Sequence, residues 1–530
     1  MHGCLLCGTR EIPSVVDEKS EHWPGPGKKT KPGRQRRREV GQGHSSEEAS
    51  EQRGKPGRKG VGGTRRSLWS EGPWQRGSRK RGCVTMTQSM GQTRPDLIRL
   101  REAAERSPQL RFSNLLHHID IDLLERAYRA LNRKAKAGVD GEDWVSYGID
   151  LGPRLEELCG RLHAKRYRTQ PVLRCWIPKA NGQVRPIGIT AIEDKIVQQA
   201  VVWVLEAIYE ADYRGFSYGF RPGRGQHNAL DAVYMAITTR KVGWILDADI
   251  SKFFDTIDHA WLIRMLQERI ADPRLLALIK RMLQSGVVDE GSWSKTEVGT
   301  PQGAVISPML GNIYLHYVLD LWVQRWRKRR AIGEMCVVRY ADDSVHGFQH
   351  RSDGKRFLRE LKQRLAKFCL SLNEEKTRLI EFGRYAAANR RQRGERKPET
   401  FDFLGFTHIC SIRRSDGKFK LLRISIAKRQ RSRLMQLRDI LMRKRHRHPF
   451  EVGAWLRRVV QGYFNYHGIP ENRKALNAYR SEVCRAWLKA LRRRSQKGAD
   501  LNWSSFTRLV RRFIPSVSVY HPYPNQRLCV

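Results

Sequence analysis

The sequence predicts an α+β fold, in which a small sheet that carries acidic residues is followed by a basic helical region. Two β-rich stretches, Trp244–Ile250 and Val337–Val345, each contain two aspartates. Apolar residues recur at helical spacing around them, as in 193–211 and 226–240. Residues 401–530 combine helical periodicity with 29 Lys and Arg against 7 Asp and Glu, a balance of +22. We therefore expect a core that contains the sheet and a helical C-terminal region.

The whole chain is strongly basic: its 530 residues carry a formal net charge of +46, and its pI is about 10.5. A charge of this size favours a polyanionic partner, and nucleic acid is the first expectation. The alternative is a basic protein that its charge keeps soluble, such as a ribosome-associated factor. The sequence has no run of 18 apolar residues, no secretory signal and no framework among its ten cysteines. We therefore expect a cytoplasmic protein with no membrane partner.

Residues 1–85 have the composition of a segment without a packed core, since Gly, Pro, Arg, Lys, Ser and Glu dominate. Two interpretations are open: a basic RNA-binding tail, or upstream sequence ahead of a working start at Met86 or Met90. We favour the second. Cys4 and Cys7 form a single C-x-x-C without a partner pair at zinc-like spacing, so we treat them as incidental.

The stretch Val337–Val345 predicts a strand, a tight turn and a second strand, with Asp342 and Asp343 at the tip. Adjacent carboxylates repel each other, and a divalent cation removes that cost because Mg²⁺ binds carboxylate and phosphate oxygens. The alternative is a hairpin with a solvated acidic turn.

A second acidic strand favours the metal interpretation. Its period-two alternation places Asp247 and Asp249 on one face of a strand that is otherwise apolar. A carboxylate buried in a central strand is costly unless it is paired or bound to metal. Two strands that present three acids can hold two metal ions, one for an attacking 3′-hydroxyl and one for a triphosphate leaving group.

Three cations, two before the acidic strands and one after them in the sequence, are candidates for contact with a nucleotide. A hairpin is expected at 173–189, turning at Asn181-Gly182, with Lys179 and Arg185 on opposite arms where they could grip a triphosphate. Two solvated strand cations are the alternative. Lys376 is a candidate proton donor to pyrophosphate.

Two further segments are candidates for contact with nucleic acid. Arg221 and Arg224 lie in an aromatic, glycine-rich loop that suits bases and phosphates, or that simply packs. The C-terminal region offers a backbone-binding face, with a merely solvated face as the alternative. Its candidate residues are Arg443, Arg445, Arg457, Arg458, Arg492, Arg493 and Arg494. Its large apolar residues, such as Tyr463 and Trp487, are expected to form core.

Seven blocks in one order together resemble bacterial group II intron-encoded proteins, which are reverse transcriptases and maturases. The blocks are Ile177–Ile189, Ser217–Gly225, Asp247–Asp258, Gly299–Tyr314, Arg339–Val345, Leu372–Thr377 and Phe401–Phe406. With the C-terminal helices, the resemblance covers about 95–525.

The resemblance implies a right-hand polymerase fold of fingers, palm and thumb. The implied division is a tail at 1–85, an N-terminal extension with fingers at 86–245, a palm at 246–385, a linker at 386–400, and a helical thumb or domain X at 401–530.

The resemblance also implies roles for single residues. Asp249, Asp342 and Asp343 would be catalytic and bind the metal ions, with Asp247 in support. Phe254 would exclude a ribose 2′-hydroxyl and Gln302 would lie along the incoming nucleotide, while Lys179 and Arg185 would bind its phosphates.

The implied activity is RNA-directed DNA synthesis, with dNTPs, a DNA primer and two Mg²⁺ ions, or Mn²⁺ in their place. The implied partners are the group II intron RNA, whose folding, splicing and mobility the protein would assist, and its DNA target. A homodimer stays open. The implied location is the bacterial cytoplasm, in the nucleoid or in a ribonucleoprotein.

One part of the family pattern is missing from this sequence. Many members end in a DNA-binding stretch and an H-N-H nuclease with paired cysteines, which Cys484 and Cys529 do not supply. We expect no second-strand cleavage by this chain, so the primer would come from a nick, a replication fork or the host. Two alternatives stand beside this reading: an RNA-binding splicing cofactor without polymerase activity, and a reverse transcriptase of a retron or defence system.

Overall fold

The computed structural model describes residues 94–178 and 184–527. The expected tail at 1–85, the turn at 181–182 and Lys179 lie outside the described residues. All the described residues belong to one compact unit. Within them, none of the helices combines the length and the apolar character that crossing a bilayer requires.

The acidic strands lie in an antiparallel four-stranded sheet, here called the central sheet, with the order β6-β7-β3-β8. Its strands are β6 Met335–Tyr340, β7 Asp343–Phe348, β3 Trp244–Asp249 and β8 Arg378–Glu381. Ile245 and Val345 lie on the same face of the sheet as the acids, further from the acidic turn. Helix α6 Gln226–Thr239 packs on these apolar residues. On the other face, Phe357 of α12 Arg351–Ala366 packs against His346 of β7.

The predicted hairpin strands form a second sheet, the hairpin sheet, with the order β2-β1-β4-β5. Its strands are β1 Val172–Pro178, β2 Val184–Ile189, β4 Val287–Asp289 and β5 Ser292–Ser294. Helix α5 Ile192–Tyr209 follows β2 and is buried along most of its length, as its apolar run predicts. The remaining helices before the acidic hairpin are α1 Pro95–Arg106, α2 Ile121–Ala130, α3 Trp144–Tyr147, α4 Leu151–His163, α7 Phe253–Thr256, α8 His259–Gln267, α9 Pro273–Leu283, α10 Ser307–Leu315 and α11 Leu321–Arg329.

We expect the whole C-terminal region to be helical, but the structure shows that it begins with strands. A three-stranded antiparallel sheet comes first, with the order β11-β10-β9. Its strands are β9 Phe401–Phe403, β10 Phe406–Ile412 and β11 Phe419–Ser425. The alternation of Phe401, Phe403 and Leu421 explains it, since these side chains enter the same core as the central sheet. The expected linker also contains a short helix, α13 Ala386–Gln392.

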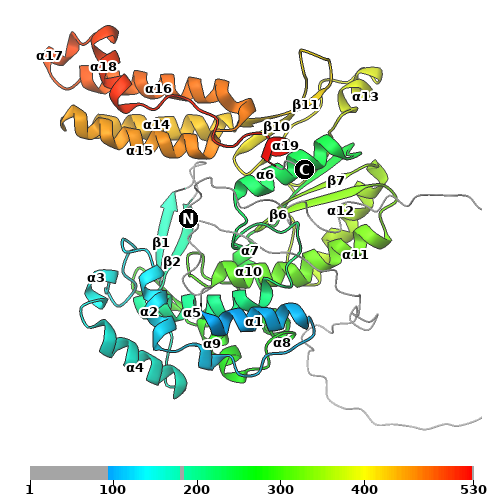
Figure 1. Ribbon diagram of the computed structural model, residues 1–530, viewed down its shortest axis with the longest axis vertical. Helices are drawn as coiled ribbons and strands as arrows, with labels where there is room; N and C mark the ends of the chain where they lie inside the picture. The colour runs from blue at the N-terminus through cyan, green and yellow to red at the C-terminus, as the bar shows by residue number, and fades with distance from the viewer. Residues whose placement is uncertain (1–93, 179–183, 528–530) are drawn as a thin grey trace, which may run out of the picture. The chain divides into compact units, whose positions relative to one another are not determined.

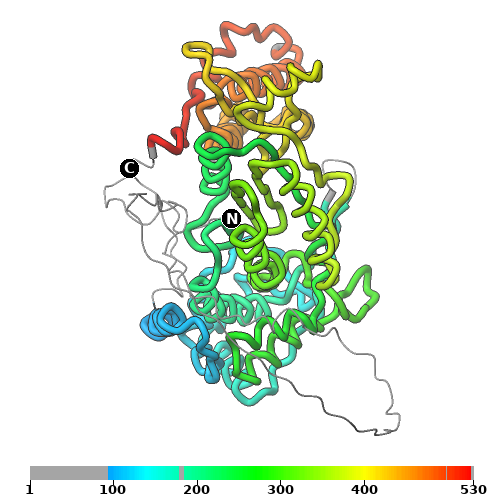
Figure 2. Tube along the Cα trace, turned by 90° about the vertical axis from the view of Figure 1, so that its right-hand side faces the viewer, coloured from blue at the N-terminus to red at the C-terminus, as the bar shows by residue number. Residues whose placement is uncertain are grey.

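A helical bundle, the C-terminal bundle, follows this sheet (Figure 1). It consists of α14 Ala427–Arg443, α15 Pro449–His467, α16 Arg473–Arg492 and α18 Trp503–Phe513, with the short α17 Gln496–Ala499 beside α16. Tyr463, Tyr479 and Trp487 lie in its core, which confirms the expectation for these aromatic residues. The C-terminal segment with α19 Pro524–Arg527 then returns beside α6, where the rings of Tyr234 and Tyr523 are 6.1 Å apart (Figures 1 and 2).

Candidate active site

The two acidic strands are direct neighbours, and their register places the acids together. Asp249 of β3 pairs with Asp343 of β7, and Asp247 pairs with Val345 two positions further along. Partners across a sheet point to the same face, so Asp247, Asp249 and Asp343 share one face. Asp342 precedes Asp343 in the turn, where Ala341 adopts a φ of +55°. The register therefore brings Asp249 and Asp343 together, while a metal site built from Asp249, Asp342 and Asp343 stays a prediction.

Desolvation and mutual repulsion raise the pKa values of these carboxylates, and nearby cations offset the shifts only in part. The pKa of Asp343 is raised to about 7, first by desolvation and then by the charges of Asp342 and Asp249. The pKa of Asp342 is raised by desolvation and by Asp249, against the opposing charges of Arg185 and Lys376. Asp247 has a pKa of about 7 for similar reasons, although Arg378 beside it on β8 opposes the shift. A bound cation removes this repulsion.

Lys376 supplies part of the positive charge next to the acids. Its Nζ lies 2.7 Å from Oδ2 of Asp249, while its side chain stays 65% exposed. The loop before β8 holds it there, because Asn373 N donates to Asp249 O at 2.8 Å. The candidate pyrophosphate donor thus contacts an acid of the predicted triad directly.

The residues fit a hard divalent cation that also binds substrate. Across residues 94–178 and 184–527, no three Asp, Glu, His or Cys side chains already converge around one point to hold a metal ion. Mg²⁺ characteristically uses one or two carboxylates together with substrate phosphates, so a complete protein cage is not expected. The acid pair across β3 and β7 offers such oxygens, and the ammonium of Lys376 marks a position that attracts a cation.

The loop before α10 lies against both the hairpin sheet and α7. Gly188 N of β2 donates to Gln302 O at 2.6 Å, and Gln302 Nε2 donates to Asp255 Oδ1 at 3.2 Å. Gly303 has a φ of +114°, and a Cβ there would lie 2.7 Å from Gly188 O, so only glycine fits. Gln302 is thereby placed between Arg185's strand and the helix of Phe254.

Phe254 is half-buried and packs on α10. A Cβ at Gly311 would lie 3.0 Å from Cε1 of Phe254, so the ring rests almost on that backbone. The backbone carbonyl of Phe254 accepts a hydrogen bond from Thr300 N at 2.7 Å, and this bond connects α7 to the loop that carries Gln302. A large aromatic ring held this firmly can act as a steric filter. Lys179, the remaining nucleotide candidate, lies outside the described residues.

A buried arginine that we did not predict supports the acidic turn. Arg339 of β6 donates from Nη1 to Ala341 O at 2.9 Å and from Nη2 to Ser217 Oγ at 2.7 Å. It also forms an ion pair with Asp320, which lies in a π-helical turn between α10 and α11. A lone aspartate in an apolar helical run was the available signal, because such an acid needs a buried partner.

The glycine-rich loop also supports the acidic turn. Its residue Arg221, which we predict as an RNA contact, lies buried. Arg221 is only 3% exposed, and its guanidinium is bound by Glu210, Arg214 O and Ser217 O. It is a structural residue rather than an RNA contact, because burial leaves it no accessible donor. Arg224 is half-buried, and its Nη1 donates to Gly215 O at 2.6 Å. Gly219 abuts Ala341: a Cβ added at position 219 would lie 2.3 Å from the Ala341 nitrogen.

The candidate RNA-binding cations of the C-terminal bundle lie at its surface, which leaves them available to a ligand. The exposed residues are Arg443, Arg457, Arg458, Arg492 and Arg493, and the half-buried residues are Arg445 and Arg494.

Comparison with known families identifies the part of the chain that carries the acids. Residues 177–408 match the model of the family described as reverse transcriptase (RNA-dependent DNA polymerase). This segment is a reverse transcriptase domain. It gives the chain a right-hand polymerase fold, and it contains the whole central sheet with the acidic strands β3 and β7.

Relatives of the reverse transcriptase domain include proteins named for introns. The group II intron-encoded protein LtrA of Lactococcus lactis subsp. cremoris is 34% identical over 43% of this chain and 37% of its own length. Protein YkfC of Escherichia coli K12 is 37% identical over 40% of this chain and 58% of its own length. The putative COX1/OXI3 intron 2 protein of Saccharomyces cerevisiae is 33% identical over 37% of this chain and 23% of its own length. The matched part of the chain thus spans between about a quarter and three fifths of the length of each of these relatives.

Proposed function

We propose that the chain is an RNA-directed DNA polymerase of a group II intron, which copies intron RNA into DNA and assists the folding, splicing and mobility of that RNA. The pairing of Asp249 with Asp343, next to Asp342 and inside a reverse transcriptase domain, carries this proposal. The homology to group II intron-encoded proteins supports the choice of RNA.

In this proposal the divalent ions, two Mg²⁺ or Mn²⁺, supply Lewis-acid chemistry at the attacking and leaving oxygens. Asp249, Asp342 and Asp343 hold them. Lys179 and Arg185 bind phosphates of the incoming dNTP, Gln302 lies along this nucleotide, and Phe254 excludes a 2′-hydroxyl. Lys376 donates a proton to the departing pyrophosphate.

The partners in this proposal are the intron RNA, a DNA primer and target, and dNTPs. The basic surface of the C-terminal bundle supports RNA binding, since exposed arginines bind phosphates through charge. The same surface favours a second candidate function, that of an RNA-binding splicing cofactor. Under either function the protein acts in the cytoplasm with its RNA.

The test is primer extension on an RNA template with dNTPs and Mg²⁺, with the full chain and its D342A/D343A variant. We expect the variant to lose about 10³-fold or more in rate, because metal-held charge stabilisation amounts to several kcal/mol. Asp416→Ala, a change at the β10–β11 turn, is the matched control and should keep full activity. Equal rates for wild type and the double variant would refute the assigned site. No extension by either, with tight salt-dependent RNA binding, would favour the splicing cofactor.

A further inference from the structure

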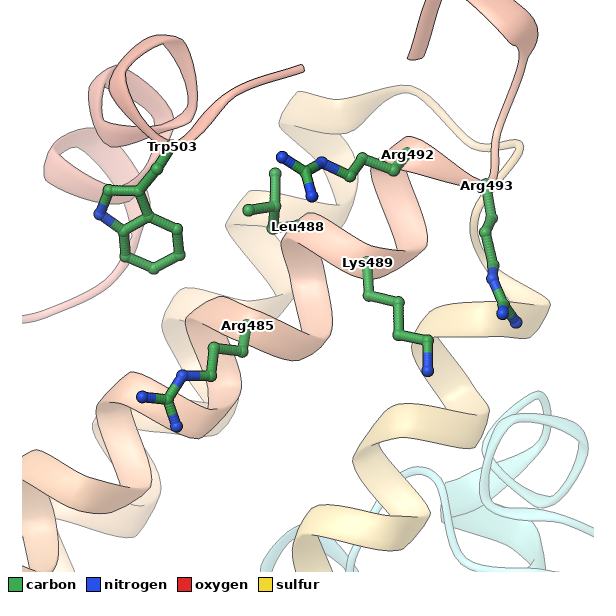
Figure 3. A pocket seen from close by; sticks show the side chains of 6 residues that line it. All are labelled: Arg485, Leu488, Lys489, Arg492, Arg493 and Trp503. Carbon is green, nitrogen blue, oxygen red and sulfur yellow. The ribbon is translucent and has the colours of Figure 1, made fainter. Parts of the chain in front are cut away.

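The C-terminal bundle has a hollow between α16 and the start of α18. Its volume is about 610 Å³, within the range typical of small-ligand sites. The residues that line it are Arg485, Leu488, Lys489, Arg492, Arg493 and Trp503 (Figure 3). Among these described residues, none is acidic.

Trp503 and Leu488 give the hollow an apolar wall and floor. Trp503 is 51% exposed although it is a large aromatic residue, and the centroid of its ring lies 5.6 Å from that of Phe506 in the core. Leu488 is buried in the core of the bundle. An indole held in this way presents a flat apolar face to solvent, and a planar partner can cover it.

Four cations also line the hollow. Arg485, Lys489 and Arg492 come from α16, and Arg493 follows its last residue. Arg492 extends toward the side of Trp503, whereas Lys489 and Arg493 point away from the indole (Figure 3). Arg492 Nε donates to Leu501 O at 2.8 Å, which fixes the direction of its guanidinium. Trp503 is the first residue of α18, so the positive end of that helix dipole lies at the same rim.

We propose that this hollow binds one unpaired nucleotide of an RNA, with its base stacked on Trp503 and its flanking phosphates held by the arginines and Lys489. Aromatic faces combined with cations are what single-stranded nucleic acid requires, whereas base-paired duplex offers no free base face. Folded RNA displays unpaired loop bases and duplex DNA does not. The inference rests on the RNA partner of the proposed function, and it adds a specific base-binding site.

The first test measures binding of the full chain to a fluorescein-labelled single-stranded RNA and to an RNA duplex of the same length. The assay contains no metal and no dNTP, so polymerase activity does not enter the result. We expect Trp503→Ala to weaken single-strand binding about 5- to 100-fold, the range for loss of one stacked base, and to leave duplex binding unchanged. Trp503→Phe should restore most of the affinity. Tyr385→Ala, which removes another exposed aromatic residue, should have no effect.

The salt dependence separates stacking from charge. Trp503→Ala should leave the slope of log K against log salt unchanged, because no phosphate contact is lost. Lys489→Gln and Arg492→Gln should each reduce the slope by about 0.7, the value for one phosphate contact in a single strand. Lys355→Gln, at an exposed position of α12, is the matched control for charge and should not alter the slope.

A photocross-link tests the contact without any substitution. Wild-type protein irradiated with a 5-iodouridine-substituted single-stranded RNA should yield a cross-linked peptide that contains Trp503. Unchanged single-strand affinity in Trp503→Ala, equal losses for single strand and duplex, or cross-links that exclude Trp503 would overturn the proposal. A preference for single-stranded DNA over RNA would also overturn it. If wild type binds no RNA at all, the RNA partner in the proposed function fails as well.

Discussion

Arg339 and Asp320 form an ion pair that is closed to solvent, with exposed fractions of 0% and 1% and a distance of 2.6 Å between Nη2 and Oδ2. A second bond joins Nε to Oδ1 at 2.7 Å. The pair orients the guanidinium so that Nη1 reaches Ala341 O, one residue before Asp342. A π-helical turn at His316–Asp320 places the carboxylate, so an irregularity in one helix sets the position of the acidic turn.

Removal of one member of this pair should disable the site and destabilise the fold. Arg339→Leu leaves Asp320 buried without a partner, and we expect a loss of about 3–5 kcal/mol in the free energy of unfolding. The double variant R339L/D320L removes both charges and should recover most of that stability. If Arg339 positions the acidic turn, the double variant should still need more Mg²⁺ for half-maximal primer extension than wild type. A double variant with wild-type Mg²⁺ dependence would restrict Arg339 to a structural role.

Lys376 should compete with metal ions for Asp249. Because its side chain is largely exposed, the ion pair contributes only about 0.2–1 kcal/mol. We expect Lys376→Ala to bind Mn²⁺ about 2- to 5-fold more tightly, measured by electron paramagnetic resonance of free Mn²⁺, while the rate of primer extension falls. Lys362→Ala removes a lysine at the same 2.7 Å distance from Glu374, away from the acids, and should bind Mn²⁺ like wild type. Weaker Mn²⁺ binding by Lys376→Ala would contradict competition.

Phe254 should set the preference for deoxyribonucleotides. Phe254→Val replaces the ring that rests on Gly311 with a shorter side chain and opens space there. We expect the ratio of kcat/KM for dNTP over rNTP to fall by about 10-fold or more, as for loss of a steric contact in a pocket. The control is Tyr385→Ala, which removes an exposed ring from the segment after β8. An unchanged ratio in Phe254→Val would remove the residue from the specificity filter.

Asp194 should make stability fall as the pH rises. It is 2% exposed, and desolvation raises its pKa to about 6, although Tyr167 and Gln170 N donate to it. A raised carboxyl pKa contributes stability that is complete below the unfolded value of 3.8 and is lost as the pH rises through 6. Relative to its D194N variant, wild type should therefore lose about 2 kcal/mol of unfolding free energy between pH 4 and pH 7.

Urea unfolding of both proteins at several pH values measures this difference. The D194N variant is the reference because its amide does not titrate, and groups that titrate in both proteins cancel. A constant difference across this range would show that Asp194 stays ionised in the folded state.

Local patterns predicted the acidic strands well, for a clear reason. Alternation determines which side chains share a face of a strand, and Asp247 and Asp249 follow this rule. The same local information placed α5 and α6, whose apolar residues recur at helical spacing. It failed at Phe401–Ser425, where the sequence predicts a helical region and the structure has three short strands.

Tertiary structure decided the partners of the charges. The sequence by itself determined that this chain is basic, that two of its strands carry acids, and that its last region is rich in arginine. Whether an arginine faces solvent or a buried carboxylate depends on residues far away in the chain. Arg221 turned inward to Glu210 and Arg339 to Asp320, whereas Arg492 stayed at the surface beside Trp503. The physical reason is that desolvation and ion pairing are set by packing between distant elements, which no local spacing encodes.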